Sequence, residues 1–515
     1  MEVRPYMEGC LSLCLIVLST LLALWFIKLS THKIKLAKKL PPGPWTLPII
    51  GSLHHLVSAL PHRRMADLSR RHGPLMHLKL GEVHTVVVSS AEVAEVVLKT
   101  NDLVFASRPR SVMLDIASNG GKGMAFAPYG ERWRQMRKLC IVELLSSKQV
   151  KRMDGIRAEE VGRLIGTIAA SAGATINVSE KVAALTHDLV SLAVFGHKFA
   201  QQKEYLREFD QMMTLLGGSS GLVDLFPSSR LVRWISNGER HMRASCVRIQ
   251  RIISDIVEGR KAARAARDGD FSTGGEDLLD VLIRLQEEDS LPLAITTETI
   301  GAILFDMFGA AMGTTTTALE WAMSELIRHP EAMAKAQQEV RALLGEDKLV
   351  ITNGDLTEAH YMRMVIKEVL RLHPPAPLLL RTTMEDCKIM GYDILQGTNV
   401  AINIFTISRD SKYWRNPEEF KPERFENKNV NYNGTYFEFI PFGAGRRQCP
   451  GIQFSSSVVE ITLANFLYHF DWKLPDGASL ALFDMSEKFR MALSRRYPLQ
   501  LTAVPHAWLK AISSN

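Results

Sequence analysis

Cysteine is scarce in this chain, with six residues among 515. Cys10 and Cys14 fall in an apolar amino-terminal stretch, and the other four are far apart, with no Cys-x-x-Cys or Cys/His run. Disulfide-stapled domains are dense in cysteine, and structural zinc sites need closely spaced ligands. The sequence therefore excludes both classes and favours a reducing compartment.

A strong charge of one sign and nucleotide-binding motifs are also lacking. The 62 basic and 55 acidic residues give a net charge of +7, and five of the lysines lie between positions 28 and 39, so the excess does not indicate a nucleic-acid partner. No GxGxxG or GxxxxGK[ST] motif lies between a strand and a helix, which predicts no nucleotide cofactor of the chain's own. The ordinary composition, 46% hydrophobic and 23% charged, excludes disorder and a multi-spanning membrane bundle.

One charge-free apolar stretch runs from Gly9 to Ile27. It is long enough to span a bilayer, and it ends in Trp25-Phe26-Ile27 without the small residues of a signal-peptide cleavage site. Lysines follow it, and Pro41-Pro42-Gly43-Pro44 is typical of a stiff, extended segment. We therefore expect a lumenal amino terminus (1–8), a transmembrane signal anchor (9–27), a basic, proline-rich neck (28–51) and a cytosolic body (52–515).

Helical patterns dominate the body, with a small β region. Alternating apolar residues predict strands at 75–80 and 85–88, around 387–394 and near 491–501, whereas residues 260–276 lack an apolar period and predict a solvated connection. The longest helical pattern runs from about Thr297 to Arg328 and stops before Pro330. Its middle, residues 309–317, is rich in glycine, alanine and threonine, which are weak or small helix residues. That middle indicates either a functional site or close packing against a neighbouring helix.

A glycine-rich segment near the carboxyl end carries the clearest chemistry. It reads Phe442-Gly443-Ala444-Gly445-Arg446-Arg447-Gln448-Cys449-Pro450-Gly451. Two glycines allow a tight turn, and a third follows the cysteine where a helix can begin. Backbone N–H groups and a nearby arginine stabilise a thiolate, which is the form of cysteine that binds a metal.

The spacing F-x-x-G-x-R-x-C-x-G resembles the haem-binding loop of the cytochrome P450 monooxygenase family, and the resemblance covers essentially the whole chain. Four further motifs occur in the family's order: Trp133 with Arg137, Ala310–Thr315, Glu368–Arg371 and Pro422–Phe425. The Pro-Pro-Gly-Pro neck and Ala127–Gly130 are similar to plant microsomal enzymes of the A-type group. The resemblance implies the P450 fold, a mainly helical haem domain behind one amino-terminal transmembrane helix.

The resemblance also assigns the cofactor site. It implies haem b, with Cys449 as the axial thiolate that favours O–O cleavage. Trp133, Arg137 and Arg447 would pair with the haem propionates, and Phe442 belongs to the same cofactor-binding set. Arg381 is a further candidate, although the proline expected before it is missing. Glu368, Arg371 and Arg424 would form a buried ion network that shapes the protein near the haem.

The long helix departs from the family pattern [AG]-G-x-[DE]-T-[TS] at one position. Thr314 and Thr315 are retained at the oxygen site, but Gly313 replaces the acid. Because proton delivery benefits from a positioned carboxylate, we expect water to fill the space and turnover to release more peroxide. Substrate contacts are expected, by family position, from mainly apolar stretches, namely residues 108–126, 215–226, 305–314, 376–380 and 489–493.

The function implied is insertion of one oxygen atom from O2 into a lipophilic specialised metabolite, with a terpenoid favoured and phenolic or alkylresorcinol-like compounds next. Electrons would come from NADPH through NADPH–cytochrome P450 reductase, with cytochrome b5 as an optional second donor, at the endoplasmic reticulum membrane. Two alternatives are a reductase-independent rearrangement or dehydration and a non-catalytic haem carrier. Gly313 slightly favours the first, whereas Thr314 argues against it and the complete site argues against the second.

Overall fold

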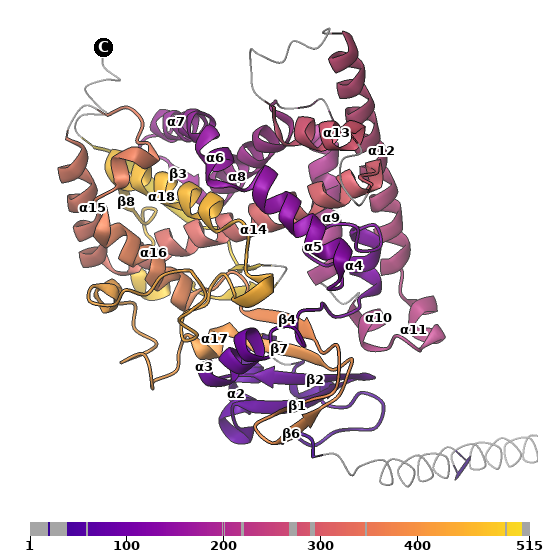
Figure 1. The fold of residues 1–515 in the computed structure, drawn as a ribbon. Coiled ribbons are helices and arrows are strands. Elements are labelled where there is room, and N and C mark those ends of the chain that lie inside the picture. Colours follow the sequence, from indigo (N-terminus) through magenta and orange to yellow (C-terminus); the bar gives the residue numbers. More distant parts are fainter. Residues whose placement is uncertain are drawn as a thin grey trace, which may run out of the picture.

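The computed structural model describes residues 19–20, 39–57, 60–197, 199, 201–217, 221–266, 276–288, 294–345, 348–489 and 492–506. A large helical part lies beside a smaller β-rich part, which carries the amino-terminal end of the body (Figure 1). The expected anchor at 9–27 and the neck up to residue 38 lie outside the described residues, apart from Ser19 and Thr20.

The helical part is built from long helices packed around α14. The long helices are α7 (Asp154–Ala170), α8 (Val178–Phe195), α9 (Gln202–Gly217), α12 (Gly238–Ala266), α13 (Leu278–Glu288), α14 (Thr297–Arg328), α15 (Pro330–Leu344), α16 (His360–Leu372) and α18 (Ile452–His469). The shorter helices of the chain are α2 (Pro61–His72), α3 (Ala91–Glu95), α4 (Val112–Ala117), α5 (Glu131–Leu139), α6 (Ser147–Arg152), α10 (Leu222–Leu225), α11 (Arg230–Ile235) and α17 (Ile404–Ile407). Of these, α2, α3 and α17 lie in the β-rich part (Figure 1).

The main sheet has the strand order β1-β2-β7-β4, from Leu75–Leu80, Val83–Val88, Asn399–Asn403 and Leu378–Thr382. Strand β2 runs parallel to β7, with Val86 opposite Val400, and the other two pairings are antiparallel. Small sheets add β3 (Thr175–Asn177), β11 (Gln500–Pro505) and β8 (Phe470–Lys473), the hairpin β5 (Cys387–Ile389) with β6 (Tyr392–Ile394), and the hairpin β9 (Glu487–Phe489) with β10 (Leu493–Arg495). The mainly helical fold with a small β region is confirmed.

Helix α14 crosses the centre of the helical part and has the bounds that the sequence predicts. The Thr296 hydroxyl accepts from the Thr299 N–H and caps its start, and Pro330 begins the next helix. Among the described residues, only α14 is long and apolar enough to cross a membrane, but 61% of its apolar window is buried inside the protein. It packs against α8, α16 and α18, as a core helix does.

One sequence prediction is wrong in part. Residues 260–266 continue helix α12 instead of forming a solvated connection. Alanine, arginine and lysine are strong helix formers, so an absent apolar period does not end a helix. Arg260 also fixes this turn, because it donates to Asp277 at 2.7 Å, to Asp280 at 2.9 Å and to the Phe195 carbonyl at 2.7 Å.

The described end of the expected neck lies against the sheet. The Pro42 carbonyl accepts from the His77 N–H at 2.8 Å, and the Asp393 N–H donates to the Lys39 carbonyl at 2.7 Å. A side chain at Gly43 would collide with the His77 carbonyl oxygen. Close backbone approach therefore requires glycine in the Pro-Pro-Gly-Pro segment.

The predicted ion network is present at the foot of α16. Glu368 and Arg371 are fully buried and form a bidentate pair with distances of 2.7 and 2.9 Å. Arg424, in the short helical turn Pro422–Phe425, donates to the same carboxylate at 2.8 Å. Remaining guanidinium N–H groups donate to backbone carbonyls, including that of Glu419, which both arginines share.

Candidate active site

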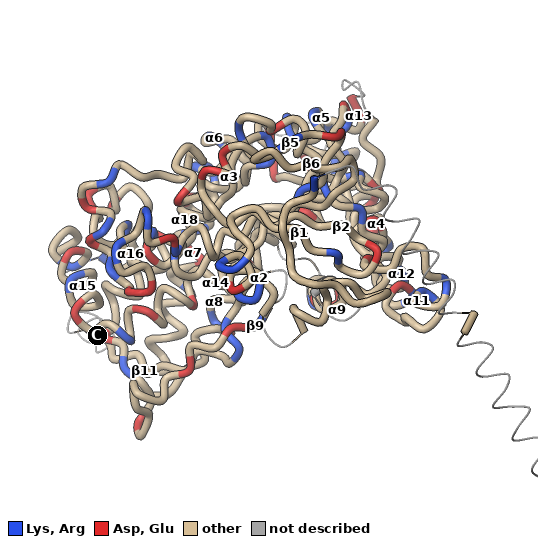
Figure 2. The backbone as a smooth tube through the Cα atoms, turned by 90° about the horizontal axis from the view of Figure 1, so that it is seen from below, with Lys and Arg blue, Asp and Glu red and all other residues tan. Residues whose placement is uncertain are grey.

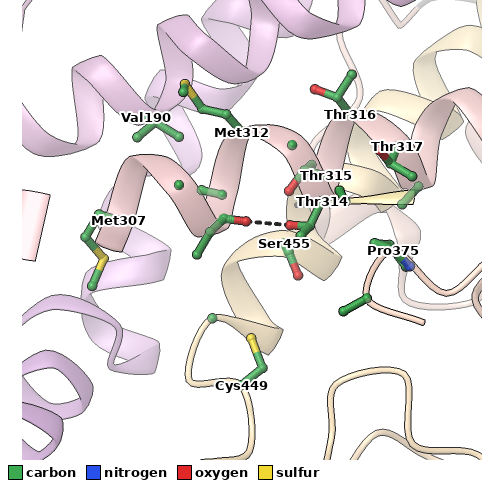
Figure 3. A pocket seen from close by; sticks show the side chains of 18 of the residues that line it. Val190, Met307, Met312, Thr314, Thr315, Thr316, Thr317, Pro375, Cys449 and Ser455 are labelled. Carbon is green, nitrogen blue, oxygen red and sulfur yellow. Dashed lines mark hydrogen bonds between the residues drawn. The ribbon is translucent and has the colours of Figure 1, made fainter. Parts of the chain in front are cut away.

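The sequence-predicted site residues come together in one place. A cavity of about 950 Å³ is lined by all nine, namely Trp133, Arg137, Gly313, Thr314, Thr315, Arg381, Phe442, Arg447 and Cys449. Cys449 lies on the loop before α18 and faces the same space as Thr314 on α14 (Figure 3). Helices and loops separated by more than half of the sequence therefore form a single pocket.

Backbone geometry holds the cysteine at the start of α18. Gly443 and Gly445 have φ angles of 71° and 69°, a region that glycine adopts without strain. The Cys449 N–H donates to the Phe442 carbonyl at 3.0 Å and closes the turn. Burial raises the pKa of the Cys449 thiol, while the Gly451 N–H and the charge of Arg137 act to lower it. These two groups are the ones that stabilise a thiolate.

Trp133 on α5 lies close to two arginines of the site. The Arg447 guanidinium lies 4.2 Å from its ring centroid, and that of Arg137 lies 5.5 Å away. The indole N–H donates to the Met124 carbonyl at 3.1 Å. Arg137 donates to the Gln448 carbonyl at 2.8 Å, which joins α5 to the cysteine loop.

Four arginines on this cavity, namely Arg108, Arg137, Arg381 and Arg447, form a cationic cluster with too few anions. Burial and mutual repulsion lower the pKa of Arg447 to about 9, that of Arg108 to about 10 and that of Arg381 well below its usual value. Arg381 is 2% exposed, and the side-chain hydrogen bond that it makes among the described residues goes to the neighbouring Leu380 carbonyl. A buried positive charge of this size is costly without a counter-charge.

The middle of α14 passes over the cysteine. The Thr314 hydroxyl donates to the Ala310 carbonyl at 2.6 Å, drawn as a dashed line in Figure 3. The buried Thr315 hydroxyl has no hydrogen-bond partner in the described part of the chain. Among the described residues, a Cβ at Gly313 would meet Ala492 Cβ alone within 4 Å, at 3.7 Å, which is ordinary contact. Packing therefore does not require glycine at position 313.

Asp306 is a site residue that the sequence analysis did not single out. It is fully enclosed, and it accepts from the N–H groups of Met124 and Ala125 at 2.5 and 2.9 Å, which fastens the loop over the cavity to α14. Burial raises its pKa to about 6, against the opposing effect of these N–H groups and of Arg108. An isolated acid in a helix carries no local signal of this contact.

The expected substrate stretches are placed unevenly. The cavity is lined by parts of 108–126, 305–314 and 376–380, and by Ala492, but not by the described residues of 215–226. Phe209 and Met213, one turn earlier on α9, line it instead. The segment just before residues 215–226 therefore lines the cavity in place of that stretch.

Comparison with known proteins identifies the family. The family model for cytochrome P450 matches residues 41–503. The ent-isokaurene C2/C3-hydroxylase of Oryza sativa subsp. japonica is 44% identical over 98% of this chain and 99% of its own, and the 5-epiaristolochene 1,3-dihydroxylase of Nicotiana tabacum is 42% identical over 91% and 94%. A solved zebrafish cytochrome P450 with abiraterone has a TM-score of 0.73 at 25% identity, covering 87% of this chain and 100% of that one.

The chain therefore belongs to the cytochrome P450 family. It is a haem-dependent monooxygenase whose relatives of similar length are plant enzymes, which confirms the resemblance seen in the motifs.

The residues of the cavity fit haem b. Haem b carries two propionates, and their negative charge would balance the excess positive charge of the arginine cluster. Cys449 offers a sulfur beside a helix start and a backbone N–H, which suits a metal-bound thiolate. The arginine cluster and the Cys449 sulfur line the same cavity, so the propionates and the iron of one haem could both be held there.

Arg447→Lys is expected to lower haem retention about tenfold, a typical cost of losing support around a metal site. Arg447 donates to the carbonyls of Ala106, Met124 and Ala127, whereas one ammonium group cannot reach all three in the same plane. The measurement is the haem absorbance per folded protein during dilution into apomyoglobin. The neighbouring Arg446→Lys, at a half-exposed position, is the control, and equal retention in both variants would contradict the assignment.

Proposed function

We propose that this enzyme inserts one atom of O2 into a lipophilic specialised metabolite, with a terpenoid as the leading substrate class and phenolic or alkylresorcinol-like compounds next. The observation that carries the substrate class is the wall of the cavity away from Cys449. Phe209 and Phe305 line it with ring centroids 5.6 Å apart, and Phe308 supports Phe209 from the core behind, at 6.3 Å. Phe126 and Met312 extend this apolar region. A hydrocarbon skeleton buries well against such a surface.

The names of the relatives support a terpenoid. The rice enzyme is named for ent-isokaurene and the tobacco enzyme for 5-epiaristolochene, and both names describe hydroxylation. An aliphatic polycycle matches an aromatic and thioether wall by shape and apolar area rather than by hydrogen bonds.

The site residues divide the work as follows in this proposal. Cys449 would hold the iron, and Arg137, Arg381 and Arg447 would hold the two carboxylates of the cofactor by charge-assisted hydrogen bonds. Trp133 would join them once its indole N–H turns from the Met124 carbonyl. Phe442 closes the cysteine turn through its carbonyl. Haem, when bound, supplies the activation of dioxygen.

The threonines act on the other side of the cavity. Thr314 holds a hydroxyl where oxygen would bind, and at present that hydroxyl donates to the Ala310 carbonyl one turn back. Thr315 adds a second, buried hydroxyl. Both can hold or pass a proton, whereas Gly313 cannot.

Electrons from NADPH are proposed to enter through NADPH–cytochrome P450 reductase, with cytochrome b5 as an optional donor. Figure 2 shows blue segments close to α5. Helix α5 carries the exposed Arg134 and Lys138, and Arg446 lies half-exposed on the cysteine loop. Arg132 turns inward to the Lys122 carbonyl and Thr299, so it does not join them. Cations around the cysteine side of the protein favour docking of an acidic flavoprotein.

The membrane location is likewise proposed from the surface. Ile49 is 79% exposed beside Trp45, and Trp234 on α11 is 76% exposed beside Leu231. The first segment adjoins the β1–β2 turn, since Gly81 donates to the Ile50 carbonyl. The connection that leads into α11 adjoins the same turn, since the Ser228 N–H donates to Glu82 at 3.0 Å. An apolar rim at this end suits a cytosolic domain (52–515) held at the endoplasmic reticulum by a single-pass anchor (9–27), with residues 1–8 lumenal and 28–51 as the neck.

The test uses membranes that contain this enzyme and a plant P450 reductase. Terpenes, phenolics and fatty-acid derivatives are supplied with and without NADPH, and product masses are recorded. We expect an NADPH-dependent gain of one oxygen atom on a terpene. A gain of one oxygen atom on phenolics alone would make a phenolic compound the substrate class in place of a terpenoid. NADPH-independent isomerisation or loss of water would establish the rearrangement alternative.

A further inference from the structure

The reaction needs protons at a place where this chain lacks the usual acid. Reduction of one atom of dioxygen to water takes up two electrons and two protons while the other atom enters the substrate. The electrons come from the reductase, and the protons must cross from solvent to the cavity. Gly313 leaves the helix without a carboxylate at the position next to Thr314.

A polar stripe continues along α14 from that position. Gly313, Thr317, Glu320 and Ser324 are spaced by four, three and four residues, so they lie on one face of the helix. Thr317, Glu320 and Ser324 are all buried, in a helix whose other buried positions are mainly apolar. Thr316 lies off the stripe: it points away from Cys449 in Figure 3, and its hydroxyl lies 2.8 Å from that of Thr186 on α8.

Glu320 is a buried carboxylate that lies outside the ion pairs of the described residues. It is 6% exposed, and the structure shows no salt bridge for it in the described part of the chain. Burial raises its pKa, and the Ser179 hydroxyl and the charge of Arg495 act to lower it. Arg495 itself directs its N–H groups to Ser324 and to the Asp484 carbonyl.

The same cavity connects Glu320 with both the reacting side and the surface. Its wall contains Cys449 and Thr314 as well as Thr317, Glu320 and Ser179. It also includes Glu180, Arg496 and Tyr497, which are exposed. The two turns of helix between Glu320 and Gly313 span about 10 Å, a gap that a short file of water molecules can bridge where hydroxyls line it.

We propose that Glu320 is the proton relay of this enzyme, taking protons from solvent at the Glu180–Arg496 mouth and passing them by way of Thr317 and water beside Gly313 to Thr314. The carboxylate absent at position 313 is thus replaced by one two turns along the same face. Glu320 acts through Thr314 and water, so it is a positioning residue for proton delivery and not a group that touches the substrate.

Glu320→Gln tests this relay because it keeps the shape and removes the acid. We expect product per NADPH consumed to fall about 10²-fold, the lower end of what a positioned acid contributes, with the electrons released as hydrogen peroxide. Turnover driven by added hydrogen peroxide should be unchanged, since that reagent brings both electrons and both protons. Equal losses in the two reactions would show a structural defect and overturn the proposal, and so would unchanged coupling.

Two variants provide matched controls. Glu325→Gln makes the same change on the same helix at a buried carboxylate that pairs with His373 at 2.6 Å and does not line the cavity, so its coupling should be normal in the folded fraction. Glu320→Asp, which keeps the acid, should restore most of the coupling. Loss of coupling in Glu325→Gln equal to that in Glu320→Gln would contradict a specific relay.

A gain-of-function variant distinguishes a missing acid from other defects. Gly313→Asp should restore coupling in the Glu320→Gln background, because Ala492 leaves room for a side chain there. A double variant no better coupled than Glu320→Gln, while Gly313→Asp alone is folded and loaded with haem, would overturn the proposal.

An infrared measurement tests the relay without turnover. On acidification, the difference spectrum of the protein should contain a carboxyl C=O band that shifts in D2O, is absent from Glu320→Gln and is present in Glu325→Gln. Such a band shows that the buried acid exchanges its proton with solvent. A Glu320 carboxyl that does not exchange on the timescale of the pH change would contradict the route through the cavity.

Discussion

Cys449→Ser is expected to abolish product formation and to remove the thiolate signature from the spectrum of the reduced carbon monoxide complex. The cysteine lies at the start of α18, with the Gly451 N–H on its sulfur and Arg137 nearby. A serine hydroxyl does not ionise at neutral pH and donates far less electron density, so the iron would lose the axial push that favours O–O cleavage. Haem content, the carbon monoxide spectrum and product are measured on the same preparation.

The control for this variant is the same substitution at another cysteine that is partly buried to a similar degree. Cys387→Ser, on β5 in the hairpin with β6, should retain the spectrum and the activity of the parent enzyme. A normal thiolate spectrum in Cys449→Ser would show that a different residue holds the iron. Far-ultraviolet circular dichroism on both variants separates loss of the ligand from loss of the fold.

Glu368→Gln is expected to destabilise the protein by about 3–5 kcal/mol, because two buried guanidinium groups would lose the carboxylate that they share. Besides Arg371 and Arg424, the backbone N–H of Lys421 donates to Glu368, at 2.8 Å. The amide can still accept hydrogen bonds but cannot balance either positive charge. Urea unfolding of the purified enzyme gives the free energy, and the fraction of haem-loaded protein gives a second readout.

The same substitution in a surface pair provides the comparison. Glu95→Gln removes an exposed helical pair with Lys99 and should cost about 0.5 kcal/mol or less. If Glu368→Gln fails to accumulate, Glu368→Asp keeps the charge on a shorter side chain and should recover part of the stability. A Glu368→Gln variant within about 1 kcal/mol of the parent would show that the backbone carbonyls around Arg371 suffice to hold it.

The sequence predicts the site well where the chemistry is local. The glycines around Cys449, the bounds of α14 and the pairing of Glu368 with Arg371 depend on residues within one turn or one loop, and each is present as expected. Arg381 joins the cavity although the proline before it is missing, because β4 fixes its position through pairing with β7.

What the sequence could not show depends on contacts across the fold. Asp306 and Glu320 read as ordinary helix acids, and only packing against the loop at 124–125 and against Ser179 reveals that each is enclosed. Arg108 fell within a stretch expected to contact substrate, yet its guanidinium belongs to the cationic cluster. The helical run at 260–266 was missed because its stabilising acids lie beyond the next connection.

The parallel pairing of β2 with β7 leaves one edge of β2 unpaired for much of the chain's synthesis. About 300 residues separate these strands, so at about 5–20 residues per second the ribosome needs roughly 15–60 s to make the second after the first. During that interval one edge of the β1–β2 hairpin is open, and Val86, Val87 and Val88 are poised to pair with any extended chain nearby. A nascent chain that stops before Asn399 keeps this edge open permanently. Truncated transcripts should therefore yield aggregates that engage chaperones, even though they encode most of the helices.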